Sequence, residues 1–205
     1  MSDDTLTDDL AISDRVEQWI QDDRPGAETR GDRGRFAFVS ARNHLLQLAA
    51  QSLPGGHTLR PWLHKRRGVQ IGEGSFIGLE ALIETAMPHL VQIGIDVHIG
   101  LRSVIVAHSH READEYRASG RVEPKVRIGD HAFIGPGAII LENVVVGEGA
   151  VVTAGSVVKT SIPPMTVVQG VPAQPVAKCG VALGCTTPTK EFTASLRPLG
   201  GARGK

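Results

Sequence analysis

The dominant pattern in the sequence is an aliphatic residue that returns at every sixth position. Its longest run begins at Ile128 and continues to Val158 without a slip. Two earlier blocks, which begin at Ile71 and Ile93, keep the same spacing over three positions each. This period fits neither the periodicity of an α-helix nor the plain alternation of a strand. It fits a chain that turns a corner every six residues.

Three such sides close a triangular coil of about 18 residues, and stacked coils form a parallel β-helix. Each aliphatic residue would point into the prism, beside the small or β-branched residue that follows four positions later. Glycine and polar residues would serve the corners, where the backbone torsions leave the β region. The small positions are Ser75, Ala81, Val97, Ser103, Ala132, Ala138, Val144, Ala150 and Ser156.

The period slips twice, and each slip predicts a departure from the coil. Between Ile83 and Ile93 the chain is too long for one hexad, so Met87–His89 should form a small corner excursion. Between Ile105 and Ile128 the extra stretch of chain is longer, and its residues are polar and charged. We expect residues 111–127 to leave the coil as an arm, because a solenoid can carry function on an excursion without disturbing its core.

These repeats make the chain resemble the hexapeptide-repeat acyltransferases, the family that contains galactoside, maltose and xenobiotic acetyltransferases. The resemblance covers about residues 60–178 and is carried by Val126–Leu141, Val144–Val158, Ile162–Pro164 and Val168–Ala173. It implies an all-β fold, a single-stranded left-handed parallel β-helix of about 4–5 triangular coils. It also implies a homotrimer. The hand and the trimer come from the resemblance and not from the repeat.

The chain ahead of the repeat predicts a helical segment. We divide the sequence into an acidic leader (1–38), a helical cap with a basic linker (39–68), the β-helix (69–178) and a C-terminal tail (179–205). The leader indicates loop or disorder, with a short helix over 13–21 as the alternative. A helix is expected over 40–53, capped by Ser40 and ended by Pro54. Its apolar face would comprise Leu45, Leu46, Ala49 and Leu53. This helix would cap one end of the solenoid, and residues 174–200 would pack at the other.

One histidine stands where the chain leaves the repeat. His108 lies in the stretch Val106–His110, just before the expected arm. In the resembling family a histidine at this place is the catalytic base, and His108 is the positional match. His110 is the second candidate, because several relatives have His-x-His here.

The register of the repeat places two further polar residues on the edge of the prism that carries His108. His108 and Asn143 each stand three positions past the periodic isoleucine of one side, one coil apart. Glu84 stands one position past the isoleucine of that side, one coil before His108. We expect the three groups to converge.

These residue types suit acyl transfer. A neutral imidazole is available near pH 7 to take the proton of an attacking hydroxyl or amine. Glu84 would fix its tautomer or grip the acceptor, and a backbone N–H or the Asn143 amide would stabilise the oxyanion. Neither Cys179 nor Cys185 lies near a base in the sequence, so direct attack in a ternary complex is expected.

The resemblance also implies where coenzyme A binds, in a groove between neighbouring subunits. The matching positions are Gly135-Pro136 on one coil and Ala154-Gly155 on the next. Lys159-Thr160 reverses the order that relatives often show, and Gln174 stands where they often have arginine. The nearest base is then Lys178, whose phosphate geometry differs from that of arginine.

Composition and charge narrow the setting. The 22 basic residues balance 22 acidic ones, which gives no bias toward nucleic acid. No apolar run approaches the ~18 residues of a membrane span. The acidic start differs from a signal peptide, and two cysteines outside any metal-ligand spacing fit a reducing cytoplasm. The basic piece 60–67 is a solvated linker with Trp62 packed on the next element, or a docking surface for an anionic acceptor or membrane.

We therefore expect an acyltransferase that moves an acetyl or other short acyl group from acetyl-coenzyme A to a hydroxyl or amine. Sugars, antibiotics and small metabolites are open as acceptors. One alternative is a non-catalytic β-helix scaffold. The other is a zinc enzyme resembling the gamma-class carbonic anhydrases, with ligands drawn from His98, His108, His110 and His131. The His-x4-His pair of that family is missing, and we expect no metal.

Overall fold

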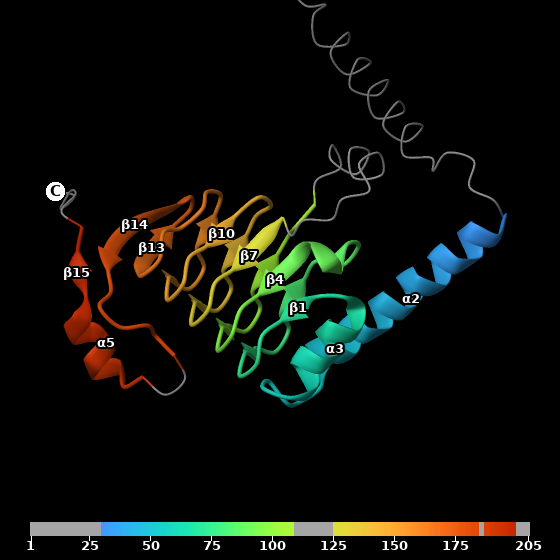
Figure 1. Cartoon of the computed structure of the whole chain (residues 1–205), viewed down its shortest axis with the longest axis horizontal. Coiled ribbons are helices and arrows are strands. Elements are labelled where there is room, and N and C mark those ends of the chain that lie inside the picture. The colour runs from blue at the N-terminus through green and yellow to red at the C-terminus, as the bar shows by residue number, and fades with distance from the viewer. Residues whose placement is uncertain (1–29, 109–124, 185–186, 200–205) are drawn as a thin grey trace, which may run out of the picture. The chain divides into compact units, whose positions relative to one another are not determined.

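The computed structural model describes residues 30–108, 125–184 and 187–199, with side chains from residue 38 onward. The chain divides into two units, Met1–Ser40 and Ala41–Lys205. The described part of the first unit belongs to helix α2 (Arg30–Ser52). The second unit contains the stacked coils, which run from green to orange in Figure 1.

Three parallel sheets form the sides of a triangular solenoid, named here sides A, B and C (Figure 1). Side A comprises β1 (Gln70–Ile71), β4 (Val91–Ile93), β7 (Val126–Ile128) and β10 (Val145–Val146). Side B contains β2 (Phe76–Ile77), β5 (His98–Ile99), β8 (Phe133–Ile134) and β11 (Val151–Val152). Side C comprises β3 (Leu82–Ile83), β6 (Val104–Ile105), β9 (Ile139–Ile140) and β12 (Val157–Val158). Each periodic residue pairs with its counterpart one coil on, as in Ile83↔Ile105 and Ile105↔Ile140. The predicted stacking is thus confirmed.

The core of the solenoid consists of the predicted periodic and small positions. Every periodic aliphatic residue is buried, and the most exposed of them, Ile71, is only 8% exposed. The small residues four positions later are buried as well. Burying one isoleucine stabilises the fold by about 1.5–3 kcal/mol. Three aliphatic ladders, one on each side, therefore form the core that holds the coils together.

Two different positions make the corners. A Cβ added to Gly135, directly after the periodic Ile134, would lie 2.5 Å from the backbone nitrogen of Ala154 in the next coil. Glycine is therefore required there for close approach. The corner residue with a positive φ stands two positions after the close-approach position. It need not be glycine, because Glu80 (φ 57°) and Asn143 (φ 59°) occupy it.

The N-terminal helices differ from the sequence prediction. Helix α2 begins at Arg30, so Ser40 lies inside it and does not cap it; no proline interrupts residues 30–39. The predicted apolar face is also wrong. Leu45 is 65% exposed, whereas Gln47 is 3% exposed because its amide binds the solenoid. The basic piece expected to be a linker forms helix α3 (Leu59–Arg67).

The helices satisfy the open edge of the first coil. Bonds between coils run in both directions: Gly78 N donates to Ile99 O of the next coil at 2.8 Å, and Arg102 N of that coil donates back to Leu79 O at 2.9 Å. The first coil ends the stack, and several of its carbonyls accept from helix side chains instead of from another coil, which covers the sheet edge. Arg60 Nε donates to Ile77 O at 2.7 Å, and Gln47 Nε2 donates to Ala81 O at 3.0 Å.

The two excursions behave differently. The first is confirmed as a short 3-10 helix, η1 (Pro88–Leu90). Of the predicted arm, residues 111–124 lie outside the described residues, as do His110 and the segment 13–21. The predicted end of the arm at 127 is wrong. Strand β7 begins at Val126, which pairs with Val91 of β4. The preceding Lys125 N already donates to Leu90 O at 2.8 Å, so the coil resumes at residue 125.

The C-terminal segment adds structure to side B. Strand β13 (Thr166–Gly170) follows β11 in parallel, and β14 (Ala173–Lys178) and β15 (Arg197–Pro198) continue the sheet antiparallel. Helix α5 (Thr189–Ser195) contributes Phe192 to a second cluster with Cys179 and Val151. The segment predicted as a tail from 179 thus holds a helix and a strand. Cys179 is a buried free thiol, whereas Cys185 lies outside the described residues.

Candidate functional site

Two side chains meet at the corner between sides C and A. His108 follows β6, and Glu84 follows β3 directly beneath it, because Ile105 pairs with Ile83. His108 Nδ1 lies 2.7 Å from Glu84 Oε2. The sequence register predicted this juxtaposition from the repeat alone.

The Glu84 carboxylate is held from several directions. Its Oε1 accepts from the backbone N–H groups of Ala86 at 2.9 Å and Met87 at 3.1 Å. Its Oε2 also accepts from Ala107 N at 2.8 Å. Burial by itself raises the pKa of Glu84, but the hydrogen bonds from His108, Ala107 and Met87 outweigh it, so the pKa lies below its ordinary value. The group is a carboxylate at neutral pH, although only 3% of it is exposed.

An ionised carboxylate at this distance fixes the histidine. It only accepts hydrogen bonds, so the neutral imidazole of His108 places its proton on Nδ1 and its lone pair on Nε2. The His108 side chain is 28% exposed, against 1% for Glu84. The arrangement is therefore an imidazole held in one orientation at a surface corner.

The other predicted site residues have different outcomes. Asn143 occupies the place of His108 one coil on, since Ile105 pairs with Ile140, and it is an exposed corner residue. Its role as an oxyanion donor stays a prediction. His110 lies outside the described residues.

Sequence reasoning missed two residues near the pair. Arg67, from α3, donates through Nη2 to the main-chain oxygen of Glu84 at 2.6 Å. His89 of η1 lies within electrostatic reach of Glu84; burial lowers the pKa of His89, and the carboxylate opposes that shift. Neither residue belongs to the six-residue repeat, so the period carries no signal for them.

The predicted coenzyme A residues do not gather within one chain. Gly135-Pro136 and Ala154-Gly155 stack at the corner between sides B and C, where Gly155 N donates to Pro136 O at 2.9 Å. Lys159-Thr160 follow β12, at the corner of His108. Lys178 lies beyond the third corner, donating to Thr166 Oγ1 at 2.6 Å and Pro164 O at 3.3 Å.

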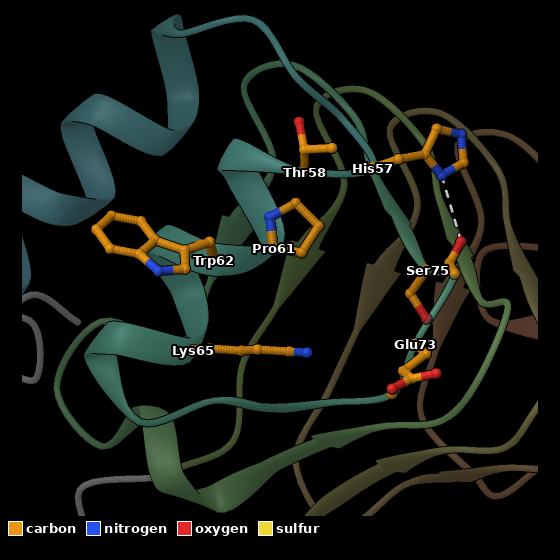
Figure 2. A pocket seen from close by; sticks show the side chains of 9 residues that line it. His57, Thr58, Pro61, Trp62, Lys65, Glu73 and Ser75 are labelled. Atoms are coloured by element: carbon orange, nitrogen blue, oxygen red, sulfur yellow. Dashed lines mark hydrogen bonds between the residues drawn. The ribbon is translucent and has the colours of Figure 1, made fainter.

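A cavity of about 230 Å³ lies at the corner between sides A and B (Figure 2). Lys65 of α3 points toward Glu73 of the coil across it, whereas the ring of Trp62, which also lines the cavity, points away from Glu73 and Ser75. The expectation that Trp62 packs on the next element is wrong. It is 48% exposed, with the Arg66 guanidinium 4.9 Å from its ring centre. This cavity and the Glu84 corner lie on different edges of the prism.

The histidines considered for zinc are scattered. His98 stacks between Phe76 and Phe133 on the outer face of side B, with ring centres 4.6 and 4.8 Å away. His131 stands at a corner, 3.8 Å from Asp96. Within residues 30–108, 125–184 and 187–199, no three His, Cys, Asp or Glu side chains are grouped to hold a metal ion. None of the helices in these segments is long and apolar enough to cross a membrane.

Comparison with known proteins gives the following matches. Residues 125–160 match the family described as bacterial transferase hexapeptide (six repeats). A hexapeptide-repeat-containing acetyltransferase from Vibrio cholerae is 22% identical with a TM-score of 0.55, over 70% of this chain and 92% of that chain. A structure complexed with acetyl coenzyme A, from Vibrio cholerae O1 biovar eltor, is 23% identical with a TM-score of 0.55, over 75% and 93%. A maltose O-acetyltransferase from Clostridium difficile 630 is 22% identical with a TM-score of 0.45, over 70% and 88%. No curated protein matches the sequence.

These matches confirm the predicted resemblance to hexapeptide-repeat acyltransferases and the predicted fold class. The fold is the left-handed parallel β-helix of those proteins. Among the described residues the solenoid has four complete coils. A partial coil follows, in which Ile162 bridges to Val146 and β13 pairs with β11.

Proposed function

We propose that the protein is a coenzyme A-dependent acyltransferase in which His108 is the general base. It moves an acetyl or other short acyl group to a hydroxyl or amine of a sugar, antibiotic or small metabolite. The observation that carries the proposal is the 2.7 Å contact between His108 Nδ1 and the buried carboxylate of Glu84. Similar solved structures are acetyltransferases, one of them complexed with acetyl coenzyme A.

The chemistry follows from the tautomer. As the acceptor oxygen or nitrogen attacks the thioester carbonyl, Nε2 of His108 takes its proton, and Glu84 stabilises the imidazolium. The tetrahedral intermediate collapses as the carbon–sulfur bond breaks, and the proton passes from His108 to the departing thiolate. A base of this kind contributes about 10²–10⁴-fold. A backbone N–H or the Asn143 amide stabilises the oxyanion.

A homotrimer is part of the proposal, because side C has an apolar outer face. Its outward ladder is Leu82, Val104, Ile139 and Val157, in direct register. At the adjoining corner Leu79 and Leu101 are 47% and 51% exposed. Side A, by contrast, presents three polar residues, Gln70, Gln92 and Arg127, and only one apolar residue, Val145, in its ladder. A second copy covering side C would join its coenzyme A corner to this copy's His108.

The test is release of free thiol from acetyl-coenzyme A in the presence of sugars, amino acids, aminoglycosides and other small acceptors. Turnover that requires both the thioester and a particular acceptor supports the proposal and identifies the acceptor class. Acetyl-coenzyme A binding is measured in parallel by calorimetry. If the donor neither binds nor turns over, the protein is a β-helix scaffold and the proposed activity is wrong.

A further inference from the structure

We infer that Arg67 is a positioning residue for the His108–Glu84 pair, which makes helix α3 part of the active-site framework. This inference rests on the proposed function. Arg67 belongs neither to the repeat nor to the resemblance that identified His108. It contacts the main-chain oxygen of Glu84, whereas the imidazole of His108 contacts the carboxylate.

The guanidinium of Arg67 holds the main chain at the residue that carries the catalytic carboxylate. Its Nη2 donates to Glu84 O at 2.6 Å and to Ile83 O at 3.0 Å. The chain leaves the coil directly after Glu84, toward η1, so these carbonyls stand where the regular stacking ends. Fixing both carbonyls fixes the base of the Glu84 side chain, and so the direction of its carboxylate.

Arg67 is itself anchored by the helices. Its Nη1 donates to Gln47 Oε1 and lies 3.0 Å from His64 Nδ1. Gln47 in turn donates to Ala81 O at 3.0 Å, which ties the network to the start of β3. His64 is completely buried and neutral, because burial and the nearby arginine charges lower its pKa to about 3. A neutral imidazole can accept the Arg67 hydrogen bond at Nδ1.

Arg67 retains its cation in an unfavourable place. It is 3% exposed, and its Nε has no hydrogen-bond partner among the described residues. Burial lowers the pKa of Arg67 to about 10, while the Glu84 carboxylate opposes the shift. A buried cation of this kind is weak evidence for stability alone. Its planar guanidinium, whose Nη2 reaches two adjacent carbonyls while Nη1 contacts Gln47 and His64, suits a geometric role.

Arg60 supplies a matched control. It is also a buried arginine of α3, 5% exposed; it caps the same coil through Ile77 O at 2.7 Å and binds Leu53 O, just after α2, at 3.1 Å. Ile77 belongs to side B, one side away from Glu84. A loss that reflects only a weakened cap should appear equally when either arginine is replaced.

The experiment measures the tautomer of His108 by its imidazole ¹⁵N chemical shifts in the wild type, Arg67→Gln and Arg60→Gln. Neutral His108 should carry its proton on Nδ1 in the wild type and in Arg60→Gln. Arg67→Gln should shift His108 toward a mixture of tautomers. Its kcat should fall on the order of 10- to 100-fold, with KM for acetyl-coenzyme A unchanged, as expected when a reacting group is misplaced.

Arg67→Lys is measured as a second variant, because Arg67→Gln can fail to fold. Lysine keeps the cation and lacks the fork, so it should show the same tautomer change to a smaller extent. An unchanged tautomer in a folded Arg67 variant, or the same change in Arg60→Gln, would overturn the inference. The tautomer does not depend on turnover. If it changes in the Arg67 variants only, while no protein transfers acyl groups, the positioning role stands and the proposed function fails.

Discussion

The imidazole of His108 lies 2.7 Å from the carboxylate of Glu84, although 24 residues separate them in the chain. The repeat causes this proximity, because Ile105 and Ile83 are partners in adjacent coils of side C. Both residues stand at places where the chain leaves the regular coil. The solenoid thus supplies fixed strand ends, and the excursions make room for chemistry.

Replacing Glu84 by glutamine should lower kcat on the order of 10²-fold. The neutral amide no longer fixes the Nδ1–H tautomer or stabilises the imidazolium. Glu80→Gln is the control, since Glu80 stands in the same coil but only forms an exposed ion pair with Arg102. Steady-state kinetics of both variants check this. Equal activities in the two variants would remove Glu84 from the site.

The close packing of the corner at Gly135 predicts a loss of stability when a side chain is added there. Gly135→Ala should destabilise the fold by about 1–3 kcal/mol, because its Cβ would lie 2.5 Å from Ala154 N. Gly137→Ala meets no described atom within 4 Å and bears only the strain of its φ of 67°, about 1–2 kcal/mol. Denaturant unfolding of both variants measures the difference. The account requires Gly135→Ala to be the less stable variant, and the reverse order would contradict it.

The repeat made the solenoid predictable, because its period identifies the buried residue on every side. It also predicted that Glu84 would lie under His108, since both are counted from paired isoleucines. It could not reveal the cap. Helix α2 buries Gln47 and exposes Leu45, because the first coil presents carbonyls that need donors. Hydrophobic patterning therefore selects the wrong face.

The predicted coenzyme A residues lie apart within one chain for a different reason. Pro136 and Lys159 stand at different corners of one prism. In the proposed trimer the coenzyme A site would be assembled from two subunits, and such a site cannot be recovered from the spacing within one chain. The placement of His110 is a further prediction that the described residues leave untested.

The buried histidine of the cap predicts a pH dependence of stability. Because the folded-state pKa of His64 falls from 6.5 to about 3, its stabilising contribution is complete above about pH 6.5 and is lost as the pH falls toward 3. The stabilising contribution of Glu84 changes only at lower pH. Because its pKa is lowered, this contribution stays intact until the pH falls below about 4.5.

His64→Gln removes this titration and keeps an acceptor for Arg67. Between pH 7 and pH 5 the variant should lose about 1–2 kcal/mol less free energy of unfolding than the wild type. His89 and His98, whose pKa values are also lowered by burial, titrate in both proteins and cancel in the comparison. Urea unfolding at the two pH values gives the result. Parallel losses in the two proteins would show that His64 is not buried in its neutral form.

The apolar ladder of side C predicts the subunit contact. Ile139→Asp should convert a trimer to monomers in sedimentation equilibrium and abolish acyl transfer, because a charge would be buried in the contact. Gln92→Asp places the same charge on the polar ladder of side A and should leave the trimer intact. A trimer that survives Ile139→Asp would place the contact on another side.

The most direct test of the central claim is the kcat of His108→Ala for the acceptor that the wild type acetylates. His44→Ala, an exposed histidine of α2, serves as the control. The account predicts that His108→Ala retains its assembly and its affinity for acetyl-coenzyme A and loses at least about 10²-fold in kcat, while His44→Ala matches the wild type. A folded His108→Ala enzyme with wild-type kcat would contradict the assignment of His108 as the base.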